Sequence, residues 1–122
     1  MTKKVLILED DEQLSLIFRT ITSQIMGEFW TIHCHDNVAS ATEDYNENKH
    51  EILLIDNYVF GNVTGITMLI NMANLNQSPE LVLFTSSDHY FSKFEGEFFD
   101  HYIGKSLEQL SSKLYKYLSK ID

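Results

Sequence analysis

Short apolar runs that alternate with amphipathic stretches constrain the fold of this chain more than any other feature of its sequence. The apolar runs lie at residues 4–8, 29–35, 51–56, 81–85 and 101–105. In most of the intervening stretches, apolar residues recur at the helical spacing, which is typical of helices with one buried face. Buried strands that alternate with helices predict a parallel sheet with helices on both faces. The expected fold class is therefore a doubly wound α/β fold with five parallel strands.

The apolar spacing also predicts where the helices lie. Residues 11–26 carry the helical pattern, and Asn37 is a candidate N-terminal cap for a helix that extends to about residue 48. In the helix after Gly65, we expect four inward side chains: Ile66, Leu69, Ile70 and Ala73. Residues 88–98 are the least regular stretch, where we expect one short helix. An apolar stripe marks the last helix: Leu107, Leu110, Leu114, Leu118 and Ile121.

Composition limits the class of protein. The chain has 122 residues, of which 43% are hydrophobic and 22% charged, so we expect residues 1–122 to be a single domain without an output domain. The net charge of −9 argues against direct binding of nucleic acid, which needs clustered Lys and Arg. Cys34 is the sole cysteine, so an internal disulfide is excluded. Because no apolar run suits a signal peptide or a membrane span, we expect a cytoplasmic protein without membrane contact.

Polar side chains follow the carboxyl ends of four of the apolar runs. These residues are Glu9, Asp10, Asp56, Thr85 and Lys105. In open parallel sheets, ligands bind outside the carboxyl ends of the strands, so we expect these side chains to share one edge. Carboxylates at close range repel one another unless a hard cation with oxygen ligands, such as Mg²⁺, lies among them. A hydroxyl and an ammonium group beside them could hold a phosphoryl group.

Four segments in this order, LILEDDE, LLIDNYVFG, LFTSS and YIGKS, resemble the receiver domain of two-component response regulators. The resemblance covers essentially the whole chain and implies a flavodoxin-like (βα)5 fold with strand order 2-1-3-4-5. It also implies a phosphoprotein of phosphorelay signal transduction. Such a protein takes a phosphoryl group, with Mg²⁺ or Mn²⁺, from a sensor histidine kinase or a histidine phosphotransfer protein. It then changes its contacts with a downstream protein and loses the group slowly, so it is not a turnover enzyme.

The resemblance assigns the acidic residues to phosphorylation and metal binding. Asp56 resembles the phosphoacceptor, placed at the end of the most apolar run in the chain. Glu9 and Asp10 resemble the acidic pair that binds the metal, together with Asp56. The backbone carbonyl of Tyr58 resembles the remaining protein ligand. No other cofactor is expected.

The resemblance also implies a switch beside the acids. Thr85 resembles the hydroxyl that binds a phosphoryl oxygen, although Ser86 could compete for this role. Lys105 resembles the lysine that pairs with the phosphoryl group. Tyr102 resembles the aromatic residue whose rotamer changes on activation. Thr85 and Tyr102 would together carry the signal from the phosphorylated carboxylate.

Several positions depart from the usual receiver pattern. Ser106 stands where the family usually has a proline, so we expect a trans peptide after Lys105, because a cis bond before a non-proline residue costs about 3 kcal/mol. Phe98 and Phe99 replace a pair of small residues, and the preceding helix looks shortened. Phe60 also replaces a proline. These changes lie on the face through which receivers usually signal, so the way in which this chain would contact a downstream protein stays open.

Three alternative functions differ in the residues that they need. The main alternative is a phosphorylation-independent pseudo-receiver that acts as a protein-binding module. A haloacid dehalogenase-like phosphatase needs a second aspartate where Tyr58 stands, and it places its acidic pair late in the chain. A flavin-binding flavodoxin relative needs a phosphate-cradling loop after the first strand, where Glu9 and Asp10 would repel phosphate. The last two are therefore disfavoured.

Three further features have two interpretations each. Tyr58 could shield the acyl phosphate from water, or it could point into solvent. Cys34 could suggest a metal site with His33 and His35, but strand alternation places the cysteine and the histidines on opposite faces, so a core cysteine is preferred. Residues 89–99 are rich in Phe and Tyr, which would mark a partner site if they are exposed or cover the sheet edge if they are not; the partner site is preferred.

Overall fold

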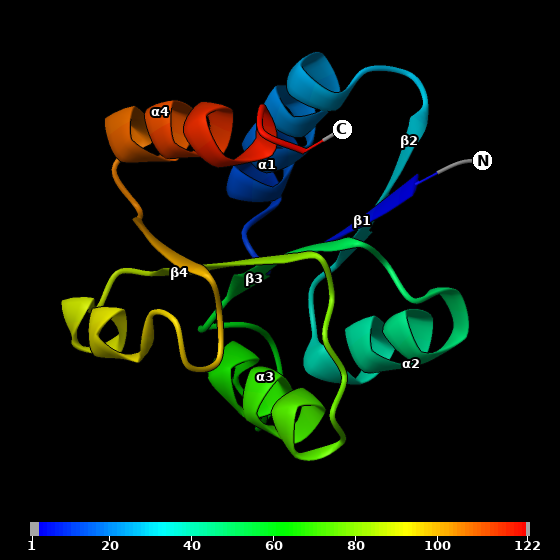
Figure 1. Cartoon of the computed structure of the whole chain (residues 1–122). Helices are drawn as coiled ribbons and strands as arrows, with labels where there is room; N and C mark the ends of the chain where they lie inside the picture. The colour runs from blue at the N-terminus through cyan, green and yellow to red at the C-terminus, as the bar shows by residue number, and fades with distance from the viewer. Residues whose placement is uncertain (1–2, 122) are drawn as a thin grey trace.

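The computed structural model describes residues 3–121, apart from the side chain of Leu107, and its centre is a five-stranded parallel sheet (Figure 1). The strands are β1 (Lys3–Leu8), β2 (Trp30–His35), β3 (Ile52–Asp56), β4 (Leu81–Ser86) and β5 (His101–Gly104). They lie in the order β2-β1-β3-β4-β5, and each neighbouring pair is parallel. The predicted fold class and strand order are both confirmed.

Helices cover both faces of the sheet, as Figure 1 shows. One face carries α1 (Glu12–Met26) and α4 (Leu107–Leu118). The other carries α2 (Val38–Asn48), α3 (Gly65–Asn74) and a short 3₁₀-helix, η1 (His89–Phe94). In the described part of the chain, none of the helices combines the length and the apolar character needed to cross a membrane.

Strand alternation divides the core into two layers. Leu6 and Leu8 of β1 pack with α2 and α3, whereas Val5 and Ile7 pack with α1 and α4. The two strands at the centre of the site, β3 and β4, are buried along their whole lengths. Each fully buried Leu or Ile side chain contributes about 1.5–3 kcal/mol relative to an exposed one, so the central strands form a rigid support.

Polar residues cap three of the α-helices. Asp11, Asn37 and Ser106 precede α1, α2 and α4, and the side chain of each accepts a hydrogen bond from a backbone N–H of the first turn. These bonds satisfy donors that a helix start leaves without intrahelical partners. The predicted cap at Asn37 is confirmed.

The buried face of α3 differs from the prediction. Its buried residues are Gly65, Met68, Leu69 and Met72, while Ala73 is exposed and the two isoleucines are only partly buried. Gly65 sets this rotation, because an added Cβ would collide with the backbone carbonyl oxygen of Asp56. The helix therefore turns its glycine side, with the positions three, four and seven residues later, onto the sheet.

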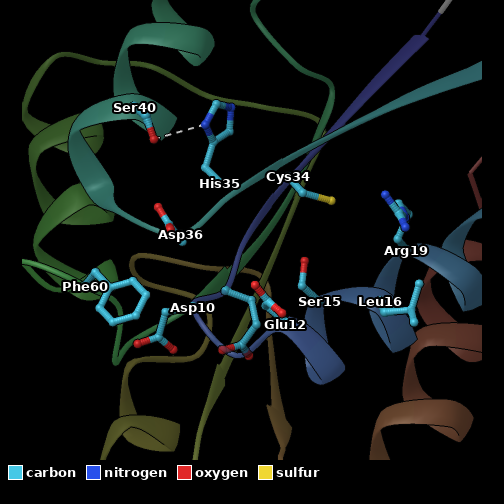
Figure 2. A pocket seen from close by; sticks show the side chains of 11 residues that line it. Asp10, Glu12, Ser15, Leu16, Arg19, Cys34, His35, Asp36, Ser40 and Phe60 are labelled. Carbon is cyan, nitrogen blue, oxygen red and sulfur yellow. Dashed lines mark hydrogen bonds between the residues drawn. The ribbon is translucent and has the colours of Figure 1, made fainter.

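Cys34 is exposed, so the prediction of a core cysteine was wrong. The alternation behind that prediction holds, because Figure 2 shows His35 pointing toward Ser40 at the start of α2 and Cys34 pointing away from it. β2 is an edge strand, and a cavity separates Cys34 from Leu16 and Arg19 of α1. Cys34 therefore lines an open surface.

The short helix expected within residues 88–98 is the six-residue η1. The aromatic residues of this region mostly face the core, since Phe99 is buried and three other phenylalanines pack against the same cluster: Phe91, Phe94 and Phe98. Phe84 stacks on Phe99 with ring centroids 4.7 Å apart. Tyr90 is the exposed exception, at 57%. The packing favours a cover for the sheet edge over the partner site that the sequence analysis preferred.

Candidate functional site

The carboxyl ends of four strands bring the predicted site residues together. Asp56 ends β3, and the parallel register places it beside Thr85 of β4. Glu9 follows β1, and its backbone N–H donates to the carbonyl of His35 at 2.9 Å. Lys105 follows β5 and reaches across to Asp56. The sheet itself therefore fixes the positions of these four side chains relative to one another.

The two carboxylate oxygens of Asp56 have different surroundings. Asp56 is only 1% exposed. Its Oδ1 lies 2.8 Å from the Lys105 ammonium nitrogen and accepts a hydrogen bond from the Thr85 hydroxyl at 3.4 Å. Its Oδ2 is buried without a hydrogen-bond partner among the described residues. A buried acceptor without a partner costs free energy, so this oxygen is available to a ligand or a reacting group.

Glu9 shows the same division between its two oxygens. It is 2% exposed, and its Oε2 accepts a hydrogen bond from the backbone N–H of Asp11 at 3.2 Å. Its Oε1 lies 3.7 Å from the Lys105 ammonium nitrogen and has no hydrogen-bond partner among the described residues. Glu9 and Asp56 thus each present one unsatisfied oxygen inside the site.

The site contains more carboxylate charge than its lysine neutralises. Burial raises the pKa of Glu9 to about 8; the charge of Asp56 adds to this effect and Lys105 opposes it. Burial also raises the pKa of Asp56, although contacts with Lys105 act in the opposite direction. Burial lowers the pKa of Lys105, but Asp56 and Glu9 outweigh it, so the net change is upward. Without a cation, Glu9 therefore keeps its proton at neutral pH.

These carboxylates fit a hard divalent cation. One oxygen from each of Glu9, Asp10 and Asp56 lies within 4.8 Å of the others. Mg²⁺ and Mn²⁺ prefer oxygen ligands, and such an ion would supply partners for the two unsatisfied oxygens. The positive charge also favours the ionised form of Glu9. The ligand role of the Tyr58 backbone carbonyl stays a prediction.

The sequence analysis missed the part that Asn57 plays. It is buried, and its backbone N–H donates to the carbonyl of Thr85 at 3.1 Å. Its backbone carbonyl accepts from Gly65, and its side-chain oxygen accepts from the backbone N–H of Ile66 at 3.2 Å. Asn57 thereby ties the end of β3 to β4 and to the start of α3. A polar residue directly after an acid that ends an apolar run was the available signal.

The Tyr102 side chain of β5 is buried in the core layer that α2 and α3 cover. Its hydroxyl donates to the carbonyl of Ser86 at 2.8 Å, next in the chain to Thr85. The Ser86 hydroxyl accepts from the backbone N–H of Asp88 at 3.0 Å, so it holds the turn that leads into η1. Thr85, in contrast, faces Asp56. The two hydroxyls therefore have different partners, and Thr85 is the one in the site.

A cavity of about 650 Å³ opens beside the carboxylates, between α1 and the ends of β2 and α2. Figure 2 shows Asp10 and Phe60 at one end of the lining and Arg19 at the other. The cavity gives the acidic residues access to solvent from this side, while Asp56 itself stays buried beneath them.

No protein-family model matches the chain, and no curated protein is similar to it in sequence. Its structure resembles the response regulatory domain of protein mrkE from Klebsiella pneumoniae, with TM-score 0.82, 18% identity, and 97% of this chain and 93% of that chain covered. It resembles the receiver domain of a Francisella response regulator with TM-score 0.75, 19% identity and 98% coverage of both chains. A receiver domain from Methylobacillus flagellatus gives TM-score 0.73 and 17% identity over 95% of this chain and 98% of that one. The chain has the receiver-domain fold.

In this receiver fold, the predicted trans peptide after Lys105 is confirmed, since the described residues contain no cis bond. Ser106 caps α4 instead, by accepting from the backbone N–H of Gln109 at 3.2 Å. Lys105 still reaches Asp56, so the position of the lysine does not depend on a proline at 106. The shortened element expected before β5 is η1, a single 3₁₀-helix.

Proposed function

We propose that this chain is a response regulator receiver that accepts a phosphoryl group on Asp56 from a sensor histidine kinase or a histidine phosphotransfer protein. The observation that carries the proposal is the environment of the Asp56 carboxylate. One oxygen is held by Lys105 and Thr85, and the other is buried without a partner among the described residues, next to two further acids. The receiver fold supports the same conclusion.

The reaction is a transfer between two nucleophiles. A carboxylate oxygen of Asp56 attacks the phosphorus of a phosphohistidine and forms a P–O bond. The P–N bond breaks, its electron pair stays on the imidazole nitrogen, and the imidazole takes up a proton. Because the transferred group spreads negative charge over its oxygens, catalysis consists mainly of positioning and charge stabilisation.

The neighbouring side chains have separate tasks in this transfer. Lys105 lies close enough to Asp56 to pair with a phosphoryl oxygen, and Thr85 can donate its hydroxyl hydrogen to another. Glu9 and Asp10, with Asp56, would hold Mg²⁺ or Mn²⁺. When bound, the cation would neutralise charge on the carboxylates and on the incoming phosphoryl group.

We propose that the signal leaves the site through Thr85 and Tyr102. Movement of Thr85 toward a phosphoryl oxygen shifts the end of β4, and the Tyr102 hydroxyl is bonded to the adjacent Ser86 carbonyl. A shift there changes the preferred rotamer of Tyr102 and the surface formed by η1 and β5. Phosphorylation then selects the state with the better phosphoryl contacts, and a downstream protein binds that state. The proposed location is the cytoplasm, with no direct contact to nucleic acid or membrane.

The position of the phosphoryl group tests this function. The chain is incubated with phosphoramidate and Mg²⁺, then treated with borohydride, which reduces an aspartyl phosphate to homoserine. Peptide mass spectrometry should locate the reduced residue at position 56 and at no other aspartate. Modification of Asp10 or Asp36 in place of Asp56 would contradict the proposal.

The second candidate is a pseudo-receiver that binds a protein without phosphorylation. The short η1 and the serine after Lys105 favour it, because both lie on the face where the resemblance places signalling. This candidate predicts a well-folded chain that takes up no phosphoryl group from phosphoramidate. The same incubation therefore separates the two functions.

A further inference from the structure

A second group of metal-ligating side chains lies between the edge strand and α2. His33 and His35 come from β2, Asp44 comes from α2, and His50 lies between α2 and β3. The phosphorylation chemistry proposed above uses none of them. Three of the five histidines of the chain are thus gathered around one aspartate.

Three donor atoms of this cluster lie within 3.5 Å of one another. Asp44 Oδ2 lies 2.9 Å from His33 Nδ1 and 3.5 Å from His50 Nε2. His33 Nδ1 and His50 Nε2 are 2.8 Å apart. A Zn²⁺ ion with tetrahedral ligands at about 2.0–2.1 Å holds neighbouring donor atoms about 3.3 Å apart. The three donors therefore need to move by only a few tenths of an ångström to form one face of such a site.

Two further side chains hold the aspartate in place. His35 Nε2 lies 2.7 Å from Asp44 Oδ2, and the other ring nitrogen of His35 lies 3.1 Å from the Ser40 hydroxyl. Asn48 donates to the second oxygen, Asp44 Oδ1, at 2.6 Å. Partners of this kind orient metal ligands and raise their affinity. The carboxylate is thus fixed with Oδ2 facing the two other donors.

Burial and hydrogen bonding of the donor groups are also compatible with a metal. Burial raises the pKa of Asp44, but hydrogen bonds from His35 and Asn48 act against it, and the net effect lowers the pKa to about 2. The His50 side chain is 0% exposed, and burial lowers its pKa to about 4 despite the charge of Asp44. At most one proton fits between the facing nitrogens of His33 and His50, so at least one lone pair is directed into the cluster. One carboxylate oxygen and two imidazole nitrogens form a ligand set typical of Zn²⁺.

We propose that His33 Nδ1, Asp44 Oδ2 and His50 Nε2 form a binding site for a borderline divalent cation, with Zn²⁺ as the ion of choice. The His33 side chain is 30% exposed, so solvent reaches the cluster from the side of β2. The nitrogen donors distinguish this site from the all-oxygen acidic site at Glu9 and Asp56. A bound ion would fasten α2 to β2 and to the segment before β3.

The ordinary alternative is a hydrogen-bonded His–Asp cluster that binds no ion. Zinc binding by calorimetry, in millimolar Mg²⁺ to occupy the acidic site, distinguishes the two. His33→Gln and Asp44→Asn are the test variants, because both positions are partly exposed and both replacements keep a polar group. His89→Gln is the matched control, since it removes a histidine outside the cluster. His50 is left intact because its full burial makes misfolding a simple explanation for any loss.

We expect one Zn²⁺ per chain and an affinity at least about tenfold lower in each test variant, with the His89→Gln control unchanged. Nitrogen NMR of the imidazole rings should show zinc-induced shifts at His33 and His50. Equal affinity in all variants would overturn the proposal, as would ring shifts confined to histidines outside the cluster. Zinc binding that is lost in Asp56→Asn but kept in both test variants would place the ion at the acidic site and would also overturn it.

Discussion

Replacement of Glu9 by glutamine should remove a pH-dependent loss of stability that the wild-type chain shows when no divalent cation is bound. The pKa of Glu9 rises from 4.5 to about 8 in the folded chain, mainly because the carboxyl group is buried. Folding therefore favours the protonated form. The contribution of Glu9 to stability is complete below pH 4.5 and is lost as the pH rises through 8. Glutamine carries no charge at any of these pH values.

The raised pKa sets the expected magnitude. Each pH unit between the two pKa values lowers the free energy of unfolding by about 1.36 kcal/mol. From pH 6 to pH 9, the wild type should lose about 3 kcal/mol through this group, because the loss ends near the folded pKa of about 8. The Glu9→Gln variant should show no such loss. Histidines and other groups titrate in both proteins, so the difference between the two curves isolates Glu9.

Urea unfolding with a chelator present, at pH 6 and at pH 9, measures this difference. Glu12→Gln is the matched control, since Glu12 lies in the first turn of α1 and is exposed. That variant should follow the wild type at both pH values. Addition of Mg²⁺ at pH 9 should stabilise the wild type more than Glu9→Gln. Parallel changes in the wild type and Glu9→Gln between the two pH values would refute the account of Glu9 as a buried carboxyl group without sufficient counter-charge.

Three further variants test other parts of the structure. Gly65→Ala should lower the free energy of unfolding in urea by about 1–3 kcal/mol, because the new Cβ would collide with the Asp56 carbonyl and overpack the site. An unchanged free energy of unfolding would contradict this contact. Lys105→Met should raise the pKa of Asp56 further, since it removes the ammonium group at 2.8 Å, and carboxyl-carbon NMR titration measures the change. Asp11→Ala should lower the free energy of unfolding by about 1 kcal/mol through loss of the α1 cap, measured by the same urea experiment.

The sheet could be predicted from the sequence because its central strands are continuous apolar runs, whereas the segments between them mix apolar and polar residues. β3 and β4 are buried on both faces and appear in the sequence as unbroken apolar runs ended by a polar residue. Asp56 and Thr85 end these two apolar runs in the sequence, and parallel pairing of the strands brings the two residues side by side. Periodicity alone could therefore place these residues at one edge of the sheet.

The errors arose where a contact outside the element decides the outcome. The rotation of α3 depends on how closely Gly65 approaches the backbone of Asp56, a contact that apolar spacing does not encode. Cys34 is exposed because α1 leaves a cavity beside the edge strand. The cluster of His33, His50 and Asp44 joins β2, α2 and the segment before β3, so no short motif marks it.

The most direct test of the central claim is the intact mass of the chain after incubation with acetyl phosphate, with and without Mg²⁺. Asp56→Asn is the test variant, and Asp36→Asn is the control, since Asp36 is an exposed acid at the end of β2. The account predicts a gain of one phosphoryl group that requires Mg²⁺, persists in Asp36→Asn and disappears in Asp56→Asn. The absence of any gain in well-folded wild-type protein, or a gain that persists in Asp56→Asn, would contradict it.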